Sequence, residues 1–264
     1  MTETHNSADG AVHLSIIGPI ARVVFDRPQA HNAMTWSMYE RLEAICTELR
    51  GNDDIRVVSF SGAGGKAFIA GTDIAQFRTF KSGDDGVAYE KRVAQFLGAV
   101  DSLPMPTVAV VDGWCVGGGL AIATACDLRI ATPAARFGAP IAKTLGNCLA
   151  ADVYVRLVAE FGIGRTKRML MLAEMLSAEE AREAGYVSLI VEPSDLTARA
   201  DAILTQIASQ APITMQTGKE AMRRLLDAVT VEDEDLIRRA YGSDDFKEGV
   251  AAFVAKRKPQ WTGR

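Results

Sequence analysis

The chain has 264 residues, with 33 acidic side chains against 29 Lys and Arg and a formal net charge of −4. This length predicts one large domain, or one domain with an appendage, which can bury a core without disulfides. There is no basic stripe and no apolar run near the roughly 18 residues of a membrane span, so neither nucleic acid nor a membrane is an expected partner.

Strands and helices alternate through the first half of the chain. Residues 1–11 are polar and are expected to be flexible; residues 13–17 and 20–25 then predict a hairpin around Gly18. Thr35 can cap a helix that runs to about residue 50. Strands are expected at 56–60, 107–111 and 127–131, with helices at 86–102 and from Gly117 onward. This alternation predicts an α/β fold with parallel strands.

The second half is predicted to be mainly helical. One short strand is expected at residues 186–191. Helical periodicity follows at 195–209, 213–228, 232–241 and 244–256. We therefore expect a flexible segment at 1–11, an α/β core at 12–194 and a helical region at 195–264.

Two glycine-containing segments, residues 65–74 and 112–121, each follow an apolar strand-like run. Each predicts a strand that turns into a helix and exposes backbone amides at the helix N-terminus, where negative charge is favoured. Two such turns at one point would form an oxyanion hole for a thioester carbonyl that becomes an enolate. Taken alone, the triple glycine Gly117-Gly118-Gly119 is explained equally well by close helix–strand packing.

Several segments together identify a family. From Val12 to its end the chain resembles the enoyl-CoA hydratase/isomerase (crotonase) superfamily. The matching segments, in family-like order and spacing, are residues 26–34, 65–74, 111–119, 125–131, 136–140, 178–187 and 248–257. The resemblance implies a crotonase-like spiral of ββα units, followed by helices that join subunits into a homo-oligomer, a trimer or hexamer.

The resemblance also implies a ligand and a site. The amides of Thr72 and Gly118 would point at the oxygen of an acyl-CoA thioester, with coenzyme A entering only as part of the substrate and no permanently bound cofactor. The remaining substrate-binding residues implied are Ala30, Ala70, Asp73, Ile74 and Lys256. For Lys256 a solvated helix end is an equal alternative, and for Asp73 and Asp127 the preferred role is to accept from backbone amides.

The chain departs from the family at its acid–base positions. By the resemblance, hydratases carry two glutamates where this chain has Ala121 and Ile141, and neither side chain can move a proton. The candidate replacements lie in residues 143–148 and at Asp152, although an Asp at a helix start is more often structural. Cys148 is a weaker candidate, as a nucleophile.

Cysteine and histidine use adds two expectations. The four cysteines form no CxxC pair, which favours reduced thiols in a cytoplasmic protein. The three histidines all lie near the N-terminus, so no metal site is expected.

The sequence therefore predicts an enzyme of hydratase or isomerase type that stabilises a thioester enolate through a backbone oxyanion hole. Two alternatives remain open. One is a non-catalytic acyl-CoA-binding protein or sensor with the same fold, and the other is a structural member of a mixed oligomer.

Overall fold

The computed structural model describes residues 9–264, so the flexible segment predicted at 1–11 falls mostly outside the described residues. Its main sheet has six strands in the order β1-β2-β3-β5-β7-β10. The strands are β1 (Ala11–Ile17), β2 (Ile20–Asp26), β3 (Val57–Gly62), β5 (Thr107–Val111), β7 (Leu128–Ala131) and β10 (Leu189–Ile190). The first two form the predicted antiparallel hairpin, and all other pairs in this sheet are parallel.

A second, smaller sheet was not predicted from the sequence. It has the order β4-β6-β8-β9. Its strands are β4 (Ala67–Ile69), β6 (Trp114–Val116), β8 (Arg136–Gly138) and β9 (Leu176–Ser177), of which the first three pair in parallel. The chain passes from a strand of the main sheet to a strand of the small sheet and then to a helix, three times in succession, which generates a spiral of ββα units.

Six α-helices and two 3₁₀ helices lie within residues 9–190. They are η1 (Pro28–Ala30), α1 (Trp36–Arg50), η2 (Ile74–Thr79), α2 (Gly83–Asp101), α3 (Gly118–Thr124), α4 (Ile141–Thr144), α5 (Ala151–Met171) and α6 (Ala178–Glu183). As predicted, Thr35 caps α1, where its side chain accepts from the amide of Met38. Helix α2 begins three residues earlier than predicted because Ser82 and Asp85 form a capping box.

Four further helices complete the chain: α7 (Leu196–Ala208), α8 (Pro212–Asp227), α9 (Glu234–Gly242) and α10 (Asp244–Val254). Their bounds agree with the predicted ones to within about two residues. Within residues 9–264, no helix combines the length and the apolar character needed to cross a membrane.

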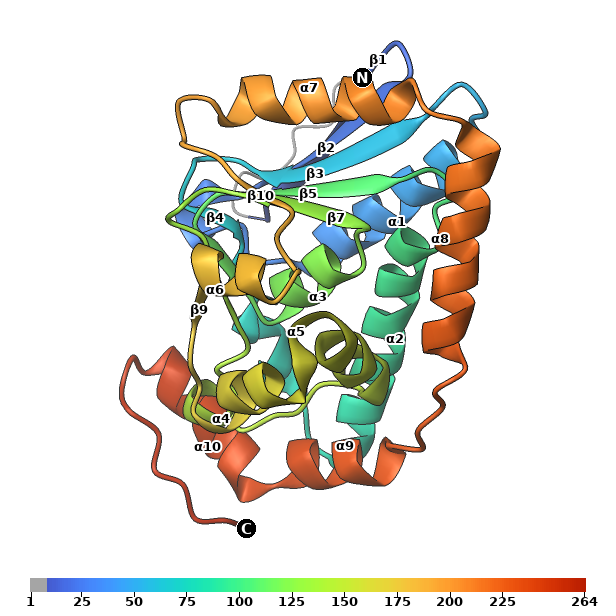
Figure 1. Ribbon diagram of the computed structural model, residues 1–264. Helices are drawn as coiled ribbons and strands as arrows, with labels where there is room; N and C mark the ends of the chain where they lie inside the picture. The colour runs from blue at the N-terminus through green and yellow to red at the C-terminus, as the bar shows by residue number, and fades with distance from the viewer. Residues whose placement is uncertain (1–8) are drawn as a thin grey trace, which may run out of the picture.

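The main sheet is buried on both faces. Helix α7 lies across one face, and α1, α2 and α3 lie beneath the other (Figure 1). Strand β3 shows why, because Val57 belongs to a core under α7 and the next residue, Val58, belongs to the larger core on the opposite face. Successive side chains of a strand point to opposite faces, so a strand covered on both sides is apolar throughout.

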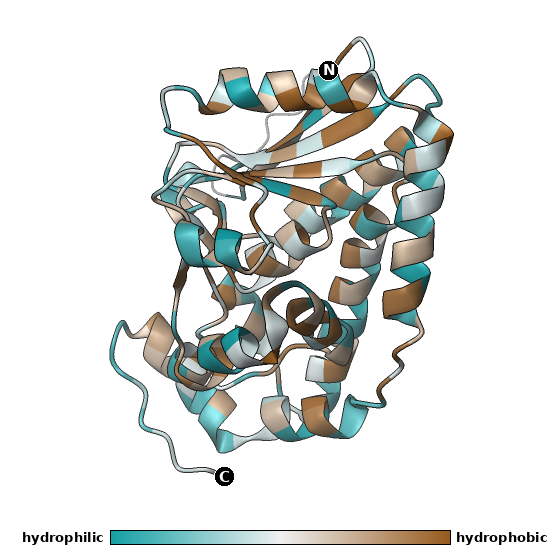
Figure 2. Ribbon diagram, viewed as in Figure 1, coloured by the Kyte–Doolittle hydropathy of each residue, from teal (hydrophilic) through white to brown (hydrophobic). Residues whose placement is uncertain are grey.

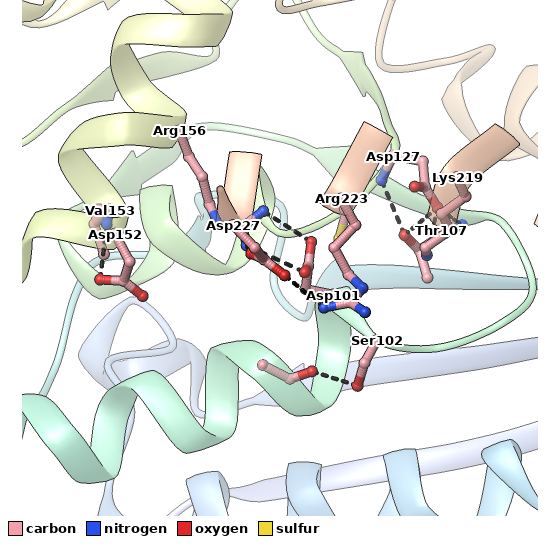
Figure 3. A network of polar contacts seen from close by, with 12 residues as sticks. Asp101, Ser102, Thr107, Asp127, Asp152, Val153, Arg156, Lys219, Arg223 and Asp227 are labelled. Carbon is pink, nitrogen blue, oxygen red and sulfur yellow. Dashed lines mark hydrogen bonds and ion pairs between the residues drawn. The ribbon is translucent and has the colours of Figure 1, made fainter. Parts of the chain in front are cut away.

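An ion pair made by the buried Lys219 fastens α8 to this body (Figure 3). Lys219 is only 9% exposed, and its Nζ lies 2.7 Å from Asp127 Oδ2 and 3.3 Å from the carbonyl oxygen of Met105. The same carboxylate oxygen accepts from the amide and the hydroxyl of Thr107. Asp127 therefore has the structural role preferred from the sequence, since it joins two strands and a helix.

Candidate active site

The two glycine turns touch each other. Gly71 and Gly117 have φ angles of +100° and +53°, which favour glycine because a Cβ atom would strain the backbone there. A Cβ added to Gly117 would lie 3.8 Å from Gly71 Cα, and one added to Gly71 would lie 3.6 Å from the Val116 carbonyl oxygen. Each turn follows a strand of the small sheet, and pairing of β4 with β6 brings the turns together.

The amides of Thr72 and Gly118 lie at this junction. The backbone of Met34 donates to Gly71 O and accepts from Asp73 N, each at 2.9 Å. The amide of Thr72, which lies between these two residues, takes no part in this pairing. Gly118 is the first residue of α3, where helix geometry gives its amide no partner. Within residues 9–264 neither amide donates to a carbonyl or side chain. A Cβ added to Gly118 would lie 3.6 Å from Thr72 N, so the two donors are neighbours.

Three hydroxyl groups surround the same point. Thr72 Oγ1 lies 2.9 Å from the hydroxyl oxygens of both Tyr39 and Tyr89. Burial raises the pKa of Tyr39 to about 12 and that of Tyr89 well above its usual value, so both phenols stay neutral. Two buried, neutral phenols therefore lie beside the amides, and exclusion of water by such side chains strengthens hydrogen bonds to a developing oxyanion.

The segments expected to line coenzyme A are joined to one another. Ala30 ends η1, and the next residue, His31, accepts from the amide of Ala70 at 3.0 Å. Asp73 caps η2, accepting from Ala75 N at 2.9 Å, and its other oxygen pairs with Arg27 at 2.8 Å. The carboxylate of Asp73 thus fixes the loop. Ile74 begins η2, and Lys256 is exposed just beyond α10.

A buried asparagine that the sequence analysis did not single out holds this arrangement. Asn32 adopts φ +58°, which asparagine tolerates better than most residues. Its Nδ2 donates to the carbonyl oxygens of Ala63 and Ala67 at 2.9 and 2.8 Å. The Asn at the end of the η1 turn was the available signal, because short polar side chains are typical of such turns.

The positions where the family resemblance implies glutamates are apolar in the fold. Ala121 is buried in α3, and Ile141 begins α4. Asp152 lies in the first turn of α5, where its Oδ1 accepts from the amide of Val153 at 2.8 Å (Figure 3). That carboxylate faces a surface hollow shared with Arg156 and Asp227. Burial raises the pKa of the Cys148 thiol to about 12, so at neutral pH it is almost entirely un-ionised.

One ionisable cluster close to the hydroxyl groups was missed from the sequence. Glu90, on α2, is 5% exposed; it accepts from the hydroxyl of Tyr241 on α9 and from the amide of Ala150. Asn147 Nδ2 donates to the same tyrosine oxygen at 3.2 Å. The signal was a glutamate within the apolar stripe of α2, between Val87 and Val93.

Comparisons with known proteins show the family of the chain. A family model described as enoyl-CoA hydratase/isomerase matches residues 16–264. The chain belongs to the enoyl-CoA hydratase/isomerase family. It is 34% identical to the putative enoyl-CoA hydratase/isomerase YngF of Bacillus subtilis, over 92% of this chain and 95% of that protein. It is also 34% identical to (E)-benzylidenesuccinyl-CoA hydratase of Thauera aromatica, over 96% and 99% of the two chains.

Solved structures of similar proteins have the same fold. A methylmalonyl-CoA decarboxylase in complex with 2-nitronate-propionyl-CoA has a TM-score of 0.88 at 25% identity, over 96% of this chain and 98% of its own. An enoyl-CoA hydratase/carnitine racemase from Magnetospirillum magneticum has a TM-score of 0.78 at 32% identity, over 96% of both chains. The predicted crotonase-like fold and superfamily are thereby confirmed.

Proposed function

We propose that this family member is an enzyme of hydratase or isomerase type that binds an acyl-CoA thioester and stabilises its enolate. The observation that carries the proposal is the meeting of the Thr72 and Gly118 amides, which have no acceptor among residues 9–264. Two amides aimed at one oxygen stabilise the charge that develops there when a proton leaves or a nucleophile adds.

Two observations support an acyl-CoA thioester as the ligand: the names of similar proteins and a hollow on the surface. Two of the similar proteins, (E)-benzylidenesuccinyl-CoA hydratase and the methylmalonyl-CoA decarboxylase in complex with 2-nitronate-propionyl-CoA, carry CoA thioesters in their names, which supports a ligand of this class. A hollow of about 410 Å³ lies between η2 and α10, over Phe77, Phe80 and Phe246, with Arg78 and Lys247 among its lining residues. Its lining residues on η2 come shortly after Asp73 and Ile74 in the chain. The apolar side chains suit the apolar part of an acyl-CoA thioester, and the two cations suit its phosphates.

Calorimetry tests the ligand. Titration with free coenzyme A and with acetyl-, butyryl-, crotonyl- and hexanoyl-CoA is expected to give a dissociation constant of about 1–100 μM for at least one thioester, because apolar burial and ionic contacts both contribute. Absence of binding across the panel would contradict the proposal. Binding without turnover of any 2-enoyl-CoA would favour the non-catalytic acyl-CoA-binding protein, a reading that the apolar Ala121 and Ile141 already support.

We also propose that the protein assembles as a homotrimer or hexamer. Its outer C-terminal helices carry apolar segments (Figure 2). Met222 and Leu225 on α8 and Leu236 on α9 are 62%, 72% and 56% exposed. Light scattering at micromolar concentration is expected to give three or six times the chain mass of 28.3 kDa. A monomer at that concentration would be the contrary result.

A further inference from the structure

The cluster of Glu90, Tyr241 and Asn147 has features that core packing alone does not explain. A carboxyl group that is 5% exposed sits on a helix face otherwise made of apolar side chains. Asn147 Oδ1 is buried and accepts no hydrogen bond within residues 9–264. A buried acceptor without a donor is costly, and its usual explanation is a bound water or ligand.

The cluster is continuous with the oxyanion hole. Tyr89 precedes Glu90 on α2 and its hydroxyl contacts Thr72 Oγ1, while the rings of Tyr89 and Tyr241 lie 6.0 Å apart between centroids. Glu90 also helps to raise the pKa of Tyr39, whose hydroxyl oxygen lies 2.8 Å from the Cβ position of Gly118. Tyr39 and Tyr89 therefore connect the carboxyl group of Glu90 to the two amides.

We infer that Glu90 is the acid–base group of this site, oriented by Tyr241, and that it removes and returns a proton on the acyl carbons of the thioester. This inference rests on the proposed function. In the step, a Glu90 carboxylate oxygen takes the α proton, and the C–H electron pair moves into the thioester. The enolate oxygen then accepts from the amides of Thr72 and Gly118. Return of the proton from Glu90 to carbon restores both partners.

The surroundings give Glu90 a suitable protonation range. The pKa of Glu90 is raised to about 7, chiefly because the carboxyl group is buried and also because the negative charges of Asp152 on α5 and Asp233 at the start of α9 disfavour its ionised form. The hydroxyl of Tyr241 and the amide of Ala150 act in the opposite direction, because they stabilise the carboxylate. The other titratable groups that interact with its charge are Tyr39, Tyr89, Cys148 and Tyr154, and all four are neutral at neutral pH. A group with a pKa near 7 can both accept and donate a proton at neutral pH.

The test is α-proton exchange of whichever saturated thioester (acetyl-, butyryl- or hexanoyl-CoA) binds best, followed by NMR in D₂O. The wild-type rate is expected to rise with pH through about 7, because exchange needs the carboxylate form. Glu90→Gln keeps the shape and removes the titrating group. It is expected to slow exchange by about 10²-fold or more while calorimetric affinity changes little. Tyr186→Phe is the matched control, since it removes a buried hydroxyl that contacts Thr124 away from this cluster.

Two variants are expected to move the pH profile in opposite directions, which a purely structural role for Glu90 would not produce. Tyr241→Phe removes a hydrogen bond to the carboxylate and should shift the midpoint to higher pH. Asp152→Asn removes a nearby negative charge and should shift it to lower pH.

Three results would overturn the assignment of Glu90: binding without exchange in the wild type, undiminished exchange in Glu90→Gln, or loss of exchange at every pH in Asp152→Asn, which would make Asp152 the base. A chain that binds no thioester at all would instead overturn the proposed function, and the inference with it.

Discussion

Replacing Gly118 with proline is expected to lower α-proton exchange or turnover by about 10²- to 10³-fold, corresponding to about 3–4 kcal/mol of lost transition-state stabilisation. Proline has no amide hydrogen, so one of the two donors disappears. The backbone itself should accept the change, because Gly118 is the first residue of α3 and proline is common at that position. Rates are measured with the thioester that binds most tightly.

The control for this variant is Gly118→Ala. Any side chain here brings a Cβ to 2.8 Å from the hydroxyl of Tyr39 and 3.1 Å from Thr72 Oγ1, so both variants disturb the pocket. Only the proline variant also removes the donor, and the ratio of the two rates isolates the contribution of the amide. Equal rates in two folded variants would show that Gly118 serves packing alone.

Replacing Gly119 with alanine is expected to destabilise the fold by about 3 kcal/mol, at the upper end of the usual cost of overpacking. A Cβ added there would lie 2.1 Å from the carbonyl oxygen of Ile69 and 2.7 Å from its Cβ, so backbone must move. For a chain of this size, that change corresponds to a fall of about 6–12 °C in the melting temperature.

Gly98→Ala provides the comparison, because nothing lies within 4 Å of a Cβ added at that helical position. There alanine is expected to leave the melting temperature unchanged or to raise it, since it favours helix. If Gly119→Ala melts like Gly98→Ala, then α3 and β4 are not packed as tightly as described.

The triple glycine shows how much of the candidate site could be predicted from the sequence. An oxyanion hole and close packing were competing explanations of this motif. In the structure the three glycines differ in what they do. Gly117 makes the turn with positive φ, Gly118 presents its amide, and Gly119 packs against Ile69. Glycine patterns are informative because they report a backbone requirement, which is local and visible in sequence.

Other features could not be predicted because they depend on contacts between distant segments. Strands of two or three residues, such as β4 and β9, are too short to show a period, so the second sheet was missed. The cluster around Glu90 draws on α2, the loop before α5 and α9, which are separated by up to 151 positions. For Asp152 the sequence suggested both an acid–base role and a helix-start role. Its contact with Val153 fits the second, and the exchange experiment tests the first.

Pairing of β4 with β6 allows the positions of the two amides and the range of accepted acyl groups to be varied independently. The spacing of the two amides is fixed by short strands of the small sheet. Glu90, which the inferred step places beside the acyl carbons, comes instead from α2, which lies between those strands in sequence. Exchanging residues on the inner face of α2 other than Tyr89, which contacts Thr72, and Glu90 should therefore alter which acyl groups are accepted without moving the donors. The ββα repeat makes this protein a scaffold in which new substrate ranges can be sought while the two backbone donors stay unchanged.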